Sequence, residues 1–275
     1  MNRIFGFFGL GVKWKKFFTG MDVYDGLVMG LSILFSIVGY IISVYAHENF
    51  LTSAMDMGLY NQYVYLFSHW KYPASTVYIG FPEGVFFLGD HATFLLPIES
   101  QFYWILGKNV LLYLQILYMI LGAIGLYKLI ISEFEKKYLA MIGVILYYLH
   151  YSLYNALSFD FHEIVLPIAL IPWLLYFMCQ KKFKSYLIVL FVSLLAREDV
   201  AIYLLLLSVF ILFSRYESKY QYFTITCLLS GSYFLLVYKF ILPAYNVSTE
   251  ASIANWPFSY IGNSLSKIFL SIIYR

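Results

Sequence analysis

Long apolar stretches without charged residues make up most of the chain, and short polar segments separate them. A helix needs about 20 mostly apolar residues to cross about 30 Å of hydrocarbon. The stretches that we interpret as such helices are residues 26–46, 109–127, 138–159, 164–180, 185–196, 200–214 and 220–238. The pattern therefore predicts an all-α integral membrane protein, a helical bundle with about seven transmembrane helices.

Two apolar stretches depart from this pattern. Residues 185–196 give only about 18 Å of helix at about 1.5 Å per residue. This helix must continue through residues 197–199 (RED) or end inside the membrane. In both cases three charges lie in the outer half of the bilayer or at its edge, where charged side chains normally face a cavity or a partner. Residues 92–106 contain Pro97 and Glu99, so we expect a helix that lies on the membrane or dips into it.

The basic residues indicate the orientation, because Lys and Arg favour the cytoplasmic side. With the N-terminus inside, 12 of the 18 basic residues fall in four short inner segments. We expect one polytopic domain over residues 1–275. Its segments are a cytoplasmic amphipathic N-terminus (1–25), a first span (26–46), a long extracytoplasmic loop with interfacial helices (47–108), the remaining spans (109–242) and an extracytoplasmic tail (243–275).

Composition excludes several other classes of protein. Apolar residues make up 62% of the chain and charged residues 12%, against about 25% charged residues in an ordinary soluble domain. So few charges cannot cover a soluble surface, which excludes a soluble enzyme, a nucleic-acid binder and a disordered chain. The 28 Tyr, 26 Phe and 5 Trp suit the boundary between lipid and water. We therefore expect membrane lipids, and no nucleic acid, as partners.

Residues that can carry chemistry collect on the predicted outer side. All five histidines and ten of the fifteen acids lie there or at an outer end of a span. A structural protein has no need of this asymmetry, whereas an active site that opens to the outer face produces it. The candidate site residues are Asp56, Gln62, Asp90, His91, Asp160, His162, Glu163, Arg197, Glu198 and Asp199.

Residue chemistry leaves the roles of these side chains open. Asp56, beside apolar neighbours, is either a general base or the cap of a short helix in the loop. Arg197 lies between membrane segments and needs an anion, which is either a neighbouring acid or a phosphate that suits its forked donors.

Several candidates also have the oxygen and nitrogen donors that suit Mg²⁺ or Mn²⁺. The alternative is that they are solvated loop residues that hydrogen-bond to one another. The candidate metal ligands are Asp90, His91, Asp160 and His162.

Four motifs resemble those of a bacterial and archaeal family of polytopic membrane proteins, catalogued as a domain of unknown function, "predicted membrane protein". They are residues 55–62 (MDMGLYNQ), 88–91 (LGDH), 159–163 (FDFHE) and 197–199 (RED). The family pattern is Phe-Asp-x-Gly-x-x-x-Gln, Gly-Asp-His, Phe-Asp-Phe-His and Lys-Glu-Asp, and the likeness covers residues 45–265. Met55 replaces the usual Phe, and Arg197 replaces the usual Lys but keeps its charge. Members usually have several more spans, so we expect a short member or a fragment.

That family is in turn similar to the GT-C glycosyltransferases, membrane enzymes that take sugars from polyprenyl-phosphate carriers at the outer face. The resemblance implies a GT-C-like fold with a long first extracytoplasmic loop, in which an acid deprotonates the acceptor. Carried over, that role falls on Asp56, with Asp90 as the rival. Binding of the carrier phosphate falls on Arg197, with His91 and His162 as helpers or metal ligands.

The residues and the resemblance together predict a membrane glycosyltransferase in the cell membrane, with its site on the extracytoplasmic side. Its substrates are a polyprenyl-phosphate-sugar donor and an acceptor in the cell envelope. The alternatives are a transporter or flippase of an anionic lipid or sugar, and a non-catalytic assembly protein. A transporter needs polar residues at mid-membrane depth. Residues 26–46 and 220–238 carry no charge, which counts against transport.

Overall fold

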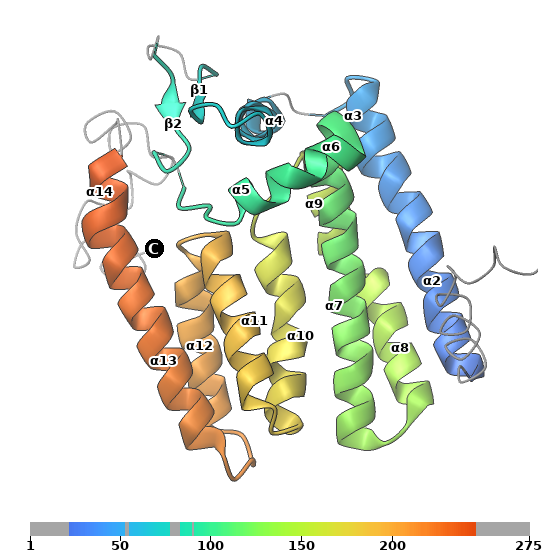
Figure 1. Cartoon of the computed structure of the whole chain (residues 1–275). Helices are drawn as coiled ribbons and strands as arrows, with labels where there is room; N and C mark the ends of the chain where they lie inside the picture. The colour runs from blue at the N-terminus through green and yellow to red at the C-terminus, as the bar shows by residue number, and fades with distance from the viewer. Residues whose placement is uncertain (1–21, 53–54, 78–82, 90, 246–275) are drawn as a thin grey trace, which may run out of the picture.

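The computed structural model describes residues 22–52, 55–77, 83–89 and 91–245, and this part of the chain is almost entirely helical. The predicted amphipathic segment before residue 22 and the predicted tail beyond residue 245 lie outside it. The long helices run side by side as a bundle (Figure 1). They are α2 (Val23–Gly39), α7 (Val110–Phe134), α8 (Lys137–Tyr148), α10 (Val165–Cys179), α11 (Phe183–Ala196), α12 (Val200–Leu212) and α13 (Lys219–Leu236).

Three helical runs among the described residues are long and apolar enough to cross a membrane: Val23–Glu48, Leu96–Phe134 and Lys219–Tyr245. Four shorter apolar helices, α8, α10, α11 and α12, lie among them in the bundle. Large apolar side chains such as Phe191 and Phe210 point away from the bundle and are exposed, as expected where lipid is the solvent. The predicted all-α membrane fold is confirmed.

One end of the bundle is covered by shorter elements (Figure 1). The first span ends there in the π-helical turn η2 (Tyr40–Tyr45) and α3 (Ala46–Glu48). The elements that lie across this end are α4 (Met55–Ser68), the hairpin of β1 (Ala74–Ser75) and β2 (Val85–Phe86), α5 (Leu96–Glu99), η3 (Ser100–Phe102), α6 (Tyr103–Leu106) and η4 (Gly107–Asn109). The run α5–α6 crosses the end of the bundle before α7 begins, and the placement of residues 92–106 at the membrane surface stays a prediction.

Small residues let α10 approach α7 closely. A Cβ at Gly122 would lie 3.2 Å from the Cα of Ala169, and one at Gly125 would lie 2.6 Å from Nε1 of Trp173. The indole of Trp173 also donates a hydrogen bond to the carbonyl of Leu121 at 2.8 Å. Membrane helices associate through such close van der Waals packing, because lipid tails are as apolar as the side chains and the hydrophobic effect does not drive the helices together.

Two predicted spans differ in detail from the structure. Residues 138–159 do not form one helix, because His150 is extended and starts a separate helix, α9 (Tyr151–Phe159). The His150 ring accepts a hydrogen bond from the backbone of Ser152 and so caps α9. Helix α11 ends at Ala196 and does not continue through the three charges that follow. Of the two alternatives for that helix, the structure selects the one in which it stops short.

The bundle closes at the end of α13, where the π-helical turn η5 (Val237–Ile241) leads into α14 (Leu242–Tyr245). The ring of Tyr245 stacks on Phe86 of β2, with ring centroids 4.9 Å apart. The last described helix therefore packs against the hairpin that covers the same end of the bundle (Figure 1).

Candidate functional site

Most of the candidate residues meet at the covered end of the bundle. They come from four segments: the first turn of α4 (Asp56), the loop after β2 (His91), the turn between α9 and α10 (Asp160, His162, Glu163) and the turn between α11 and α12 (Arg197, Glu198, Asp199). Helices α10, α11 and α12 are packed together, so their connecting turns lie close to one another. Asp90 lies outside the described residues.

Glu198 fastens the long loop to the bundle. Nδ1 of His91 donates to Oε1 of Glu198 at 2.7 Å, and the backbone of Ala92 donates to Oε2 at 2.9 Å. Burial opposes ionisation of Glu198, but these two donors outweigh it and hold the pKa of Glu198 below its usual value. A third link joins the backbone of Leu95 to that of Leu195 at 3.2 Å. Glu198 therefore remains a carboxylate and fixes the loop over the turn between α11 and α12.

Arg197 is held only loosely by its neighbours. Its Nη1 lies 3.8 Å from Oε2 of Glu163, and its Nε lies 3.3 Å from Oδ1 of Asp199. Nε of Arg197 and Oδ1 of Asp199 are buried but have no hydrogen bond of ordinary geometry within the described chain. The Arg197 side chain is 24% exposed, and its Nη atoms, unlike the buried Nε, remain accessible as donors for another anion.

Glu163 is an acid with a perturbed proton affinity. Its side chain is buried, and Oε1 accepts no hydrogen bond from the described residues. Burial raises the pKa of Glu163 to about 7, although Arg197 partly opposes this rise. Burial also raises the pKa of Asp199, against the effect of Arg197. The turn between α9 and α10 therefore contains a carboxyl group that exchanges its proton near neutral pH.

This pKa predicts a pH dependence of stability. The pKa of Glu163 is higher in the folded protein than in the unfolded chain, so its contribution is fully present below the unfolded value. That contribution is lost as pH rises through about 7. We expect the melting temperature of the protein in detergent to fall between about pH 5 and 8, and to fall less in Glu163→Gln. Glu83→Gln, at an exposed acid, is the matched control. Parallel pH profiles for wild type and Glu163→Gln would contradict the assignment.

Asp160 and His162 lie beside Asp56. Burial raises the pKa of Asp160 to about 6; Thr52 and the backbone of Met57 lower it, and the charge of Asp56 raises it. Neither carboxyl oxygen of Asp160 has a hydrogen bond of ordinary geometry within the described residues. Burial lowers the pKa of His162, while Asp56 acts in the opposite direction. The start of α4 and the turn between α9 and α10 are thus electrostatically coupled.

Asp56 itself is partly exposed and occupies the first turn of α4. Because α4 begins at Met55, Asp56 lies inside the helix and not at its N-cap; a carboxylate in a first turn is nevertheless favoured by the helix dipole, so a role in stabilising the helix start fits as well as the catalytic one. The assignment of Asp56 as the base stays a prediction.

Gln115 supports this site and was missed from the sequence. Its amide nitrogen donates to the carbonyls of Ala156 (3.2 Å) and Asp160 (3.1 Å), and its oxygen accepts from the backbone of His162 at 2.8 Å. The ring of His162 also stacks on Phe159, with centroids 4.9 Å apart. A buried amide in an otherwise apolar span is unusual, and this was the signal that could have identified Gln115.

Gln62 has its hydrogen bonds elsewhere. Its oxygen accepts from the hydroxyl of Ser75 at 2.6 Å and from the backbone of Thr76 at 3.0 Å. Its nitrogen donates to the hydroxyl of Thr76 at 3.1 Å. These bonds tie α4 to β1, so the geometry favours a role in positioning the loop.

The candidate metal ligands do not form a metal site among the described residues, since no three His, Cys, Asp or Glu side chains converge there. The Nδ1 atom of His91 is already engaged by Glu198, and the third candidate group, Asp90, is not described. Asp160 and His162 are neighbours in one turn, and they are better explained by the charge cluster around Asp56 and Arg197.

Comparison with known proteins identifies the family of the chain. A family model described as "Predicted membrane protein (DUF2079)" matches residues 46–275. The chain belongs to this family. The match confirms the resemblance inferred from the four motifs. The matched range includes every candidate site residue of this DUF2079 protein. No curated protein and no solved structure matches the chain.

Proposed function

We propose that this DUF2079 protein is a membrane glycosyltransferase that moves a sugar from a polyprenyl-phosphate carrier to an acceptor in the cell envelope. The observation that carries the proposal is a loosely paired guanidinium, Arg197, among buried carboxyl groups at one end of a membrane bundle. A phosphate supplies the anion that such an arginine favours, and Arg recognises phosphate through its forked donors. The predicted outer location of this end places the reaction at the extracytoplasmic face.

An apolar groove that starts beside the charged cluster supports a lipid-linked donor. The groove has a volume of about 190 Å³ and lies between α10 and α12. It begins at Ile164 and Val200, which directly follow Glu163 and Asp199 in the chain. Its remaining lining residues are Pro167, Ile168, Ile171, Tyr203 and Leu204. A phosphate at Arg197 would thus have an apolar path for its isoprenoid chain.

The proposed reaction follows from two of these side chains. Asp56 takes the proton from the acceptor hydroxyl as that oxygen bonds to the anomeric carbon of the donor sugar. The bond between this carbon and the phosphate oxygen breaks, and the electron pair leaves with the polyprenyl phosphate. Arg197 stabilises the charge that develops on this leaving phosphate.

The other candidate residues have supporting roles in this proposal. Glu198 and His91 hold the long loop over the site, while Gln62 positions the hairpin. Asp160, His162, Glu163 and Asp199 set the charge around Arg197 and Asp56. Asp90 remains the rival for the role of base. No step of the proposal passes through Mg²⁺ or Mn²⁺.

Filling the groove tests the lipid-linked donor. Ile168→Trp places a larger side chain in the groove, whereas Ile188→Trp changes an exposed residue of α11 that does not line it. We expect Ile168→Trp to weaken binding of undecaprenyl phosphate to the purified full chain by about tenfold or more, and Ile188→Trp to leave it unchanged. Native mass spectrometry in detergent measures both affinities. Equal binding by both variants would remove the groove from the proposal.

A further inference from the structure

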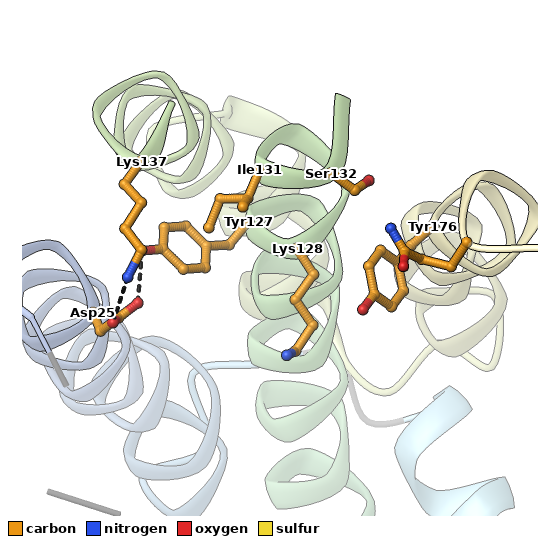
Figure 2. A pocket seen from close by; sticks show the side chains of 8 residues that line it. Asp25, Tyr127, Lys128, Ile131, Ser132, Lys137 and Tyr176 are labelled. Atoms are coloured by element: carbon orange, nitrogen blue, oxygen red, sulfur yellow. Dashed lines mark hydrogen bonds and ion pairs between the residues drawn. The ribbon is translucent and has the colours of Figure 1, made fainter. Parts of the chain in front are cut away.

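A second cavity lies at the opposite end of the bundle from the candidate site. It has a volume of about 300 Å³, and Figure 2 shows its lining residues. The walls come from the start of α2, the end of α7, the start of α8 and the end of α10. In the predicted orientation this end lies at the cytoplasmic leaflet, where anionic lipids attract basic residues.

Three polar side chains that line this cavity have hydrogen-bond donors with no acceptor among the described residues. Lys128 extends from α7 into the space between α2 and α10 (Figure 2). Within the described chain, the Lys128 ammonium, the Gln180 amide and the Tyr176 hydroxyl make no hydrogen bond or ion pair. The ammonium of Lys182 lies 5.9 Å from the centroid of the Tyr176 ring and adds a second positive charge nearby.

The charge on the opposite wall is already matched. Asp25 accepts from Nζ of Lys137 and from the hydroxyl of Tyr127, both at 2.8 Å (Figure 2). Asp22, the other partner of Lys137 at 2.8 Å, has a side chain that is 46% exposed, so water screens its charge. Asp22 and Asp25 are both paired with Lys137. Lys128, in contrast, has no ion-pair partner among the described residues, so the cavity offers its ammonium to an anion.

We propose that this cavity binds the headgroup of an anionic phospholipid. The phosphate accepts hydrogen bonds from Lys128, Gln180 and Tyr176, and the acyl chains lie along the apolar surfaces of the helices. Charge-assisted hydrogen bonds from an ammonium to a phosphate are among the stronger polar contacts. Basic pockets between membrane helices at the cytoplasmic face recognise anionic headgroups by the same chemistry. The lipid would join α2, α7 and α10 at this end.

Lipid binding to the purified full chain tests the proposal. The probes are dioleoyl phosphatidylglycerol, dioleoyl phosphatidylcholine with the same acyl chains, and glycerol 3-phosphate, which has the headgroup chemistry without the chains. Wild type is expected to bind phosphatidylglycerol about tenfold more tightly than phosphatidylcholine, as measured by native mass spectrometry. Lys128→Gln is expected to remove this preference, while Lys128→Arg retains it.

Lys184→Gln is the matched control, because Lys184 is an exposed lysine at the same end that does not line the cavity. Equal loss in Lys128→Gln and Lys184→Gln would show a general basic surface and overturn the site. Equal binding of the two lipids by wild type would also overturn it. Competition by glycerol 3-phosphate as strong as that by the lipid would reassign the cavity to a soluble phosphate compound. Lys128 is exposed, so unchanged melting temperatures of the variants are expected and complete the control.

Discussion

Replacing Arg197 by glutamine is expected to lower the rate of sugar transfer on the order of 10²- to 10³-fold, the usual cost of removing one preorganised donor from a developing negative charge. The reason lies in the loose pairing of this guanidinium with Glu163 and Asp199, at 3.8 Å and 3.3 Å. A side chain that already satisfied its neighbours would be structural, and its loss would unfold the turn. Arg197 instead makes no hydrogen bond of ordinary geometry to these acids, and in the proposed reaction its accessible donors bind the leaving phosphate.

Arg197→Lys separates these two interpretations. This variant keeps the positive charge and loses the forked donors, so activity is expected to fall by about tenfold, less than in Arg197→Gln. Lys108→Gln removes an exposed positive charge at the same end of the bundle and serves as the control. The measurement is the initial rate at which the polyprenyl-phosphate-linked sugar is consumed in membranes that contain each variant at equal amounts. Equal rates in Arg197→Gln and wild type would exclude Arg197 from phosphate binding.

Asp56→Asn is expected to reduce the same rate on the order of 10²- to 10⁴-fold, because an amide cannot accept the acceptor proton. This substitution also distinguishes the catalytic from the helix-stabilising interpretation. A residue that only stabilises the start of α4 through the helix dipole would lose on the order of 0.3–1 kcal/mol of stability on this change and leave the rate unaffected. Asp56 lies in the first turn of α4, which leaves both interpretations standing until this test.

Glu83→Gln is the control for Asp56→Asn, since Glu83 is an exposed acid of the same long loop. Both variants are expected to melt within a few degrees of wild type, because the first-turn charge of Asp56 contributes little to stability. A full rate in Asp56→Asn would assign Asp56 to the helix start and move the search for the base to Asp90.

Much of the fold could be predicted from the sequence, because a long apolar run without charged residues indicates a helix that crosses the lipid bilayer. The predicted span 164–180 corresponds to α10, Val165–Cys179, within a residue at each end. The break at His150 was missed, although His150 and Ser152 interrupt the apolar run and form the cap of α9. The sequence did not decide whether the helix before Arg197 continues through it or ends first, because this depends on how the helix packs in the bundle; in the structure α11 ends at Ala196.

The grouping of the site was predictable, and its contacts were not. Side chains at the outer ends of spans were expected to meet, and Glu163, Arg197 and Asp199 do so. The pairing of His91 with Glu198 spans 107 positions and depends on how the loop folds over the bundle, which no local pattern encodes. The support from Gln115 was likewise hidden, because its partners are backbone groups of another helix and turn.

The most direct test of the glycosyltransferase proposal compares envelope glycans and polyprenyl-phosphate-linked sugars by mass spectrometry. The strains are a deletion, the deletion complemented with wild type, and the deletion complemented with Asp56→Asn at equal expression. The proposal predicts that a glycan is lost on deletion while its lipid-linked sugar accumulates, and that wild type but not Asp56→Asn restores it. Identical glycans and lipid-linked sugars in all strains would contradict the proposed function.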